Sequence, residues 1–196
     1  MFCMAAAANQ VRIISGRWRG SKLAFPDAEG LRPTSDRIRE TLFNWVGGLV
    51  PGARCLDMFA GSGALGFEAA SRGAAHVVMI ERNPVIVAAL QANRDRIDDD
   101  DVIEIHAADA RSLAGRCEMP FDLVFLDPPF SDPGLLASSV DALVGSECVK
   151  PGGRIYLELP RQAPLPDLPE DWVQEKAKAA GQVGYYLFRR IDSVAD

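Results

Sequence analysis

Short apolar runs alternate with amphipathic segments along the chain from residue 53 onward. The apolar runs span residues 53–59, 76–81, 102–108, 121–127 and 153–159. Candidate helices lie between them at about 63–72, 84–97, 109–115 and 133–146. Apolar strands separated by helices are typical of βα units and of a parallel sheet with right-handed crossovers. The pattern therefore predicts an α/β protein with helices on both faces of the sheet.

The two ends of the chain carry different patterns. Residues 11–25 hold two β-prone runs around two glycines, which predict a twisted hairpin. Apolar residues then recur at helical spacing behind the N-cap candidates Thr34 and Ser35, and this helix should end near residues 47–48. Residues 171–191 predict two last strands that pair as a hairpin, because no helical segment separates them.

Length and composition indicate one domain. A chain of 196 residues can bury one α/β core but is too short for two ordinary domains and a linker. Residues 1–52 are thus expected to form one unit with a ligand-binding domain over 53–196. No apolar run reaches the ~20 residues of a membrane span, and the first ten residues lack the basic segment of a secretory signal. We expect a cytoplasmic monomer with no membrane partner.

The cysteines and histidines predict neither a metal site nor a disulfide framework. The four cysteines form no CxxC pair, and His76 and His106 stand 30 residues apart without ligand spacing. Cys55 and Cys117 lie in or near apolar runs and are expected to be thiols in or near the core. Both histidines are expected to be structural.

Charge is distributed unevenly along the chain. The net charge is −6, but residues 1–39 hold seven basic side chains against three acidic ones and carry +4, which leaves −10 for the rest. A basic arm on an acidic body is typical of an enzyme that binds a polyanion next to a small-molecule site, although scattered solvated arginines are the alternative. Trp18 could stack on a base or pack against the protein. The candidate phosphate ligands are Arg12, Arg17, Arg19, Lys22 and Arg32.

A glycine-rich loop follows the first strand of the predicted sheet, in the segment LDMFAGSGALGF. Its glycines Gly61, Gly63 and Gly66 match the GxGxxG pattern of dinucleotide-binding proteins. Asp57 argues against a dinucleotide, because it lies beneath the loop where the anionic pyrophosphate would sit. A carboxylate there suits the ammonium and sulfonium groups of S-adenosylmethionine instead. The loop therefore favours this cofactor over a nicotinamide or flavin.

Further carboxylates end the neighbouring strands. Ligands of an open parallel sheet lie outside the carboxyl ends of its strands, so Asp57, Glu81, Asp109 and Asp127 should converge on one crevice. Glu81 follows Gly61 by 20 residues and is expected to accept hydrogen bonds from two ribose hydroxyls. Asp109 is placed either to accept from the exocyclic amine of adenine or to cap the following helix.

The segment FDLVFLDPPFSDP carries the most specific signal. A buried strand runs into Asp127, Pro128, Pro129 and Phe130, and the two prolines fix the backbone and remove two amide donors. Acceptors from Asp127 and the Pro128 carbonyl, next to a flat aromatic wall, suit a planar exocyclic amine. Accepting its protons frees the nitrogen lone pair to attack a sulfonium methyl group. These four residues are the predicted catalytic set.

With these motifs the chain resembles the class I S-adenosylmethionine-dependent methyltransferases. The runs IISGRWRGSKLAFP and GLRPTSDRIRETLFNW resemble the bacterial small-subunit ribosomal RNA guanine-N2 methyltransferases of the RsmD type, and the likeness extends from about Val11 to Ile191. It implies a seven-stranded Rossmann-like fold, a target guanine in 16S rRNA, and motif matches in LDMFAGSG, IERN and DPPF. It also implies places near the cofactor and RNA for Thr34 and Arg37.

The resemblance completes the list of cofactor ligands and the substrate prediction. The expected cofactor ligands are Asp57, Phe59, Ala60, Gly61, Ser62, Gly63, Glu81, Arg82, Asn83, Asp109, Ala110 and Thr34. The substrate is expected to be 16S rRNA or a small-subunit assembly particle. Guanine offers N1–H and N2–H donors side by side, which match a carboxylate, but this favours guanine over adenine only weakly. Adenine N6, a protein glutamine, a nicotinamide dehydrogenase and a non-catalytic RNA-binding module stay as alternatives.

Overall fold

A seven-stranded sheet forms the centre of the computed structural model, which describes residues 9–28, 31, 34–98, 101–114, 117 and 119–191. In sheet order its strands are β5 (Ile103–Ala107), β4 (His76–Glu81), β3 (Arg54–Asp57), β6 (Phe121–Leu126), β7 (Val149–Pro160), β9 (Val183–Arg190) and β8 (Trp172–Ala180). The first five strands are parallel, and β9 and β8 form the antiparallel hairpin predicted at the C-terminal end. The expected mostly parallel α/β fold is confirmed.

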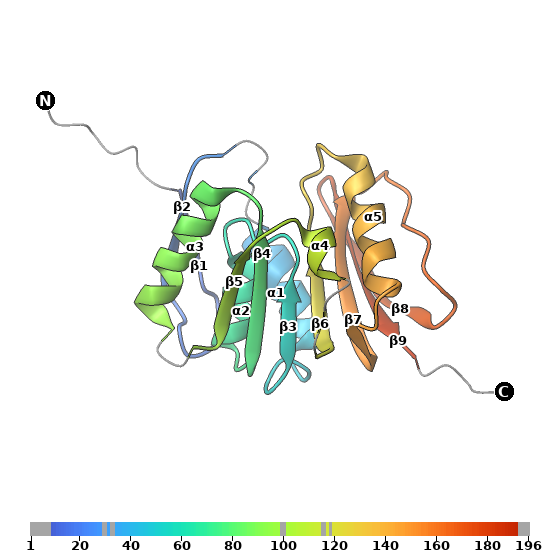
Figure 1. Ribbon diagram of the computed structural model, residues 1–196, viewed down its shortest axis with the longest axis horizontal. Coiled ribbons are helices and arrows are strands. Elements are labelled where there is room, and N and C mark those ends of the chain that lie inside the picture. Colours follow the sequence, from blue (N-terminus) through green and yellow to red (C-terminus); the bar gives the residue numbers. More distant parts are fainter. Residues whose placement is uncertain are drawn as a thin grey trace, which may run out of the picture.

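Helices cover both faces of this sheet (Figure 1). On one face lie α1 (Asp36–Val46), α2 (Ala64–Ser71) and α3 (Pro84–Ile97), whose buried residues share a core cluster with Cys55, Met79 and Phe125 of the strands. On the other face α4 (Ala110–Ala114) and α5 (Pro133–Val144) share a second cluster with the alternate strand residues. Successive strand residues thus serve opposite faces, because their side chains alternate with a period of two.

Side chains cap the N-terminal ends of two helices, and Ser35 at the first of them was a predicted candidate. The Ser35 side chain accepts a hydrogen bond from the Ile38 amide at the start of α1, and Asn83 accepts from the Val85 amide at the start of α3. Helix α2 has no side-chain cap at Gly63, which adopts a left-handed φ of 80°. Asp57 accepts from the Gly66 amide instead, so the strand before the loop caps the helix after it.

The predicted N-terminal hairpin forms a separate two-stranded sheet of β1 (Asn9–Arg12) and β2 (Lys22–Phe25). It lies beside α3, as Figure 1 shows at the β5 end of the main sheet. The buried amide of Asn93 joins the two, because it accepts from the Ala24 amide at 3.2 Å and donates to the Ala24 carbonyl at 2.8 Å. The hairpin is thus hydrogen-bonded to the body along its strand edge.

A buried carboxylate fixes the segment that follows β1. Glu68 of α2 is fully buried and accepts hydrogen bonds from the amides of Ile14 at 2.7 Å and Ser15 at 3.0 Å. It also forms ion pairs with Arg39 at 3.5 Å and Arg72 at 2.7 Å. Arg39, one of the seven basic residues of the N-terminal region, is therefore part of the interior and does not contribute to a basic surface.

Gly16 lets the same segment approach α2 closely. Its φ is +85°, and an added Cβ would lie 1.9 Å from the Ser71 carbonyl oxygen. The Arg17 amide donates to that oxygen at 2.8 Å. Only glycine fits here, because both the backbone angle and the close approach exclude a side chain.

The expectation that the cysteines form no disulfide is wrong for one pair. Cys117 and Cys148 form a disulfide with a Cα–Cα separation of 5.5 Å. They are 31 residues apart, and they meet because the chain before β6 lies beside the start of β7. Spacing along the sequence does not reveal a contact that the sheet creates. Cys55 is a buried free thiol, as predicted.

Candidate functional site

A cavity of about 780 Å³ opens at the carboxyl ends of the parallel strands. The chain passes outward from β3 through β4 to β5 and then returns to the other side of β3 with β6. The loops after β3 and β6 therefore diverge to opposite sides of the sheet, and they leave a crevice between them. Residues of both loops line the cavity, together with the N-terminal end of α1 and the turn between β8 and β9.

Four carboxylates lie along this crevice on one face of the sheet. Asp57 is in register with Met79 of β4 and Phe125 of β6. Glu81 and Asp127 each follow those partners by two residues, so they share the same face. Glu158 of β7 follows Leu157, the register partner of Leu126, and is therefore level with Asp127. The row runs across β4, β3, β6 and β7.

Asp57 lies at the floor of the cavity. Its side chain is 1% exposed, and its Oδ2 accepts the Gly66 amide hydrogen at 3.0 Å. Burial raises the pKa of Asp57 to about 7, with further contributions from the negative charges of Asp127 and Glu81. A cation placed near these acids would favour the ionised form. The site is therefore electrostatically suited to a positively charged ligand.

Glu81 joins the second strand to the glycine loop. Its two carboxylate oxygens accept hydrogen bonds from the Gly61 amide at 3.1 Å and the Asn83 amide at 2.8 Å. A carboxylate has about four lone-pair sites, so two remain for ligand hydroxyls. The same contacts hold the carboxylate in one orientation at the cavity wall.

We expect the Glu81→Ala substitution to weaken cofactor binding by about 1.5–3 kcal/mol, as for the removal of a charge-assisted hydrogen bond. Isothermal titration with S-adenosylmethionine measures this. The matched control is Glu104→Ala, which removes an exposed carboxylate from the neighbouring strand β5. Equal affinities of the two variants would remove Glu81 from the binding site.

Asp109 caps α4, as one of its two sequence interpretations predicts. Its Oδ1 accepts from the Arg111 amide at 2.9 Å, and both oxygens contact the Arg111 guanidinium. Hydrogen bonds from Arg111 lower the pKa of Asp109 to about 2. Asp109 also lines the cavity, so it can contact a ligand while it caps the helix.

Asp127 is held by a residue from the opposite side of the cavity. The Thr34 hydroxyl donates to Asp127 Oδ2 at 2.8 Å. Burial raises the pKa of Asp127 to about 6, and the Thr34 hydrogen bond opposes that shift. Family resemblance alone predicts a place near the cofactor for Thr34, and the hydrogen bond gives it a physical role. It orients the carboxylate and leaves Oδ1 for a ligand.

The residues after Asp127 form the mouth of the cavity. Pro128, Pro129 and Phe130 all line it. Phe130 is 42% exposed, so its ring is accessible at the wall of the cavity. An aromatic ring held at an open mouth can stack on a planar ligand.

The structure brings together nearly all the residues predicted for this site. Those that line the cavity are Asp57, Phe59, Ala60, Gly61, Ser62, Glu81, Arg82, Asn83, Asp109, Ala110, Thr34 and the four residues 127–130. Gly63 does not line it. An added Cβ at Gly63 would lie 2.5 Å from the Phe67 ring, so this glycine serves close packing beneath the loop.

Sequence reasoning missed Glu158 and most of the apolar wall. Glu158 is 3% exposed, lines the cavity and accepts a hydrogen bond from the Tyr156 hydroxyl at 2.7 Å. An acidic residue inside the apolar run GRIYLEL was the available signal. The apolar wall comes from side chains distant in sequence, among them Leu31, Ile38, Ile86, Leu135 and Val183.

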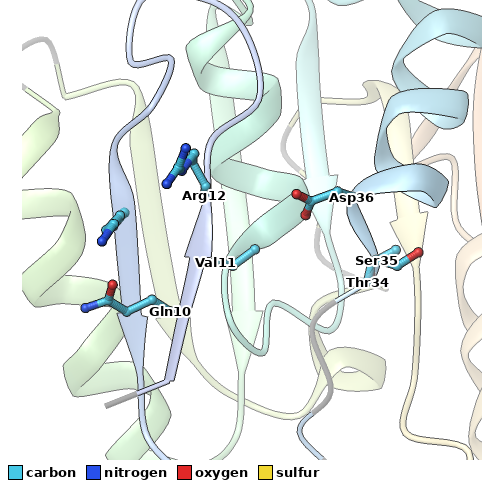
Figure 2. Close-up of a pocket in the computed structure, with 7 residues that line it drawn as sticks. Gln10, Val11, Arg12, Thr34, Ser35 and Asp36 are labelled. Atoms are coloured by element: carbon cyan, nitrogen blue, oxygen red, sulfur yellow. The ribbon is translucent and has the colours of Figure 1, made fainter. Parts of the chain in front are cut away.

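A second hollow of about 450 Å³ adjoins the cavity, and Figure 2 shows it between the β1–β2 hairpin and the start of α1. Thr34 and Ser35 line both hollows, so the two hollows adjoin at these residues. Arg12 of β1 and Lys22 of β2 line this hollow, and Figure 2 shows Asp36 on the side opposite Arg12. Two cationic side chains therefore line the hollow next to the cavity.

The other predicted RNA-contacting residues have different environments. The Arg17 guanidinium lies 4.3 Å from the Trp18 ring centre and pairs with Asp98 at 3.4 Å. Trp18 packs against the core, as the packing interpretation predicts. Arg19 and Arg37 are exposed. Arg32 lies outside the described residues.

Within the described parts of the chain, no group of three or more His, Cys, Asp or Glu residues could hold a metal ion. His76 and His106 both contact Glu104, away from the cavity. Among those same residues, no helix is both long and apolar enough to cross a membrane.

Known proteins resemble this chain over nearly its whole length. Residues 11–189 match the family model described as conserved hypothetical protein 95. The chain is 41% identical over 185 residues to ribosomal RNA small subunit methyltransferase D of Escherichia coli (strain K12), with 94% of this chain and 92% of that protein covered. The protein of the same name from Haemophilus influenzae is 40% identical, with 93% and 95% covered.

The fold agrees with a solved structure as well. The structure of the Escherichia coli protein yhhF, described as a methyltransferase, superimposes with a TM-score of 0.87 at 39% sequence identity. The match covers 94% of this chain and all of that one. The similarity therefore includes both the N-terminal hairpin and the main sheet.

Proposed function

Because the chain belongs to the family described as conserved hypothetical protein 95, whose named relatives are small-subunit ribosomal RNA methyltransferases, we propose that it transfers a methyl group from S-adenosylmethionine to a guanine N2 of 16S rRNA. The target that this family implies is guanine 966. The observation that carries the proposal is the Asp127-Pro128-Pro129-Phe130 segment, which lies at the mouth of an acidic cavity at the switch point of the sheet.

The donor set of the cavity fits S-adenosylmethionine. This cofactor supplies an electrophilic methyl group on a positively charged sulfur. Glu81 is positioned by two backbone amides to accept from ribose hydroxyls. Asp57 and its acidic neighbours favour a cation, while Ile86 and Ala110 provide apolar surface for an adenine ring. A pyrophosphate would meet these acids unfavourably, which argues against a dinucleotide.

Asp127 would activate the target nitrogen. The lone pair of an exocyclic amine is delocalised into its ring, which makes the amine a poor nucleophile. Asp127 Oδ1, with the Pro128 carbonyl, would accept the N–H protons and stabilise the positive charge that grows on nitrogen. Thr34 holds Oδ2 and so fixes the direction of this acceptor. Phe130 would stack on the flipped base and hold it at attack distance.

The proton is lost after methyl transfer. A methylated ammonium is far more acidic than the free amine, so a strong base is not needed. Asp127 has a pKa of about 6 and is mostly ionised at neutral pH, so it can take this proton. Water at the open mouth then carries the proton away.

Methyl-tritiated S-adenosylmethionine tests the proposal. Label should enter 16S rRNA from a strain that lacks the endogenous activity, offered naked and as small-subunit particles, and digestion should yield N2-methylguanosine. Label in N6-methyladenosine or in protein glutamine would identify the alternatives instead. No transfer to any of them, with cofactor binding intact, would favour an RNA-binding module without turnover.

The hairpin side of the second hollow should bind RNA phosphates. Replacing Arg12 and Lys22 by alanine is expected to lower RNA affinity and to reduce the slope of log K against log salt by about 0.7–0.9 for each phosphate that is no longer neutralised. Filter binding across a salt series measures this slope. The matched control replaces Lys176 and Lys178 by alanine, which are two exposed residues of β8 at the opposite edge of the sheet. An unchanged slope in the double variant would exclude this hollow from the RNA path.

The proposal also covers the location, the oligomeric state and the domain organisation of the protein. Ribosomal RNA places the protein in the cytoplasm, and we take the protein to act as a monomer in which residues 1–52 and 53–196 form one unit. Light scattering of the purified protein, alone and with cofactor, measures the mass. The mass of a dimer would change the proposed oligomeric state and leave the proposed reaction unaffected.

A further inference from the structure

Glu158 is a buried carboxyl group that the proposed mechanism leaves without a role. It lies on β7, level with Asp127 at the end of the neighbouring strand β6. Both residues line the same cavity. The Tyr156 hydroxyl occupies its Oε1. Within the described residues, no hydrogen bond reaches Oε2 from the protein, although the side chain is only 3% exposed. An interior carboxyl oxygen at a cavity wall is open to a ligand.

The surroundings of Glu158 favour its neutral form. Burial raises the pKa of Glu158 well above its usual range, and the negative charge of Asp127 raises it further. The titratable groups facing it are Asp127 just after β6, Tyr156 from its own strand and Tyr185, its register partner on β9. None of these is a cation, and only the hydrogen bond from Tyr156 opposes the rise in the pKa of Glu158. Of the two neighbouring acids, Glu158 therefore favours its protonated form more strongly, and Asp127 is the better acceptor.

Resting on the proposed function, we infer that Glu158 is a specificity-determining residue that recognises the N1–H and O6 edge of the target guanine, while Asp127 accepts from N2. Guanine presents a donor, a second donor and an acceptor at N2, N1 and O6. Asp127 complements the first. Glu158 Oε1, which keeps a second lone pair beside the Tyr156 hydroxyl, accepts from the second, and Oε2 carries the hydroxyl that donates to the third. Adenine with N6 at Asp127 would present only an acceptor at N1 and a C–H beyond it.

The spacing of the two acids agrees with this recognition. Neighbouring strands lie about 4.8 Å apart, and side chains level with each other point to the same face. One purine edge can therefore contact both groups. The Tyr156 hydroxyl orients Glu158, as the Thr34 hydroxyl orients Asp127. Tyr156 is itself fixed in the core between Phe125 and Tyr185. Both acids are thus held in one orientation before the base arrives.

A base analogue separates this role from a structural one. The substrate is 16S rRNA, naked or reconstituted into particles, with either guanine or 2-aminopurine at the target position, made by splinted ligation. 2-Aminopurine keeps the N2 amine but lacks N1–H and O6. We expect the wild-type protein to prefer guanine by about 100-fold in kcat/KM. Glu158→Leu should abolish most of that preference, by slowing guanine about 100-fold and 2-aminopurine by less than about threefold.

Glu158→Gln is the matched conservative variant, because an amide keeps one acceptor and one donor. It should stay within about tenfold of wild type on guanine and keep the preference over 2-aminopurine. Its rate should also hold to higher pH than that of the wild type, whose Glu158 loses its donor on ionisation. Cofactor titration and thermal unfolding check that both variants fold, and if Glu158→Leu does not fold, the Glu158→Gln profile alone decides.

Two results would overturn the inference. Equal slowing of both substrates by Glu158→Leu would mean a structural role. A Glu158→Gln variant as slow as Glu158→Leu would mean that an ionised carboxylate is needed. Failure of the wild-type protein to methylate guanine would instead refute the proposed function.

Discussion

Replacement of Asp127 by alanine is expected to slow methyl transfer by about 10³-fold or more, while the affinity for S-adenosylmethionine changes by less than about threefold. The substitution removes the acceptor that draws the lone pair out of the base and stabilises the ammonium charge. It leaves Glu81 and its two amide contacts untouched, and these lie two strands away. Single-turnover transfer from labelled cofactor measures the first effect and titration calorimetry the second.

Asp127→Asn distinguishes charge from hydrogen bonding. The amide keeps one acceptor oxygen, but it turns an amino group toward either Thr34 or the substrate, so we expect a loss nearly as large as that of alanine. The matched control is Asp132→Ala, since Asp132 is an exposed carboxylate near the cavity mouth that makes no side-chain cap. A fully active Asp127→Ala variant would leave the DPPF segment without a catalytic role.

The rate should also depend on pH through this residue. Burial raises the pKa of Asp127 to about 6, so its carboxylate takes up a proton as the pH falls through that value. The protonated form neither accepts both amine hydrogens nor stabilises the charge on nitrogen. Transfer should therefore decline below about pH 6 and be retained at neutral pH. In a Thr34→Val variant the decline should begin at higher pH, because the missing hydrogen bond favoured the ionised form.

The sheet and its cavity could be predicted because their signals are local. Most of the apolar runs end in or next to an acidic residue, and parallel strands bring those ends to one edge of the sheet. The N-cap at Ser35 was among the predicted candidates for the same reason. The DPPF segment carried its chemistry in four consecutive residues. Local signals of this kind need no knowledge of long-range pairing.

The features that were missed depend on contacts between distant segments. Glu158 lies beside Asp127 only because β7 pairs with β6. The same pairing brings Cys117 to Cys148. The amphipathic pattern of α1 does not place Arg39 on the apolar face of the helix. The residue is nevertheless buried, because it pairs with the interior carboxylate of Glu68. Glu68 and Glu158 each stand within an apolar segment, which was the available signal in the sequence. The sequence does not show which residues they contact.

Removal of the Glu68 side chain is expected to have the largest effect on stability. Glu68→Ala would leave the Ile14 and Ser15 amides without their acceptor and would remove the interior countercharge of Arg39. Breaking a buried pair in this way costs about 3–5 kcal/mol in the free energy of unfolding. Urea denaturation followed by circular dichroism measures the loss. Asp95→Ala, which breaks only the exposed pair with Arg94, should stay within about 0.5 kcal/mol of wild type.

The same variant tests whether the N-terminal region and the sheet unfold as one unit. Glu68 holds the segment after β1 against α1 and α2, so its removal should expose that segment before the rest unfolds. Hydrogen exchange at residues 11–25 should then increase more than exchange in β3 or β6. RNA affinity should fall with it, because Arg12 and Lys22 lie on the hairpin that this carboxylate fixes in place. A uniform increase in exchange across the sheet would show instead that Glu68 stabilises the whole fold and positions nothing in particular.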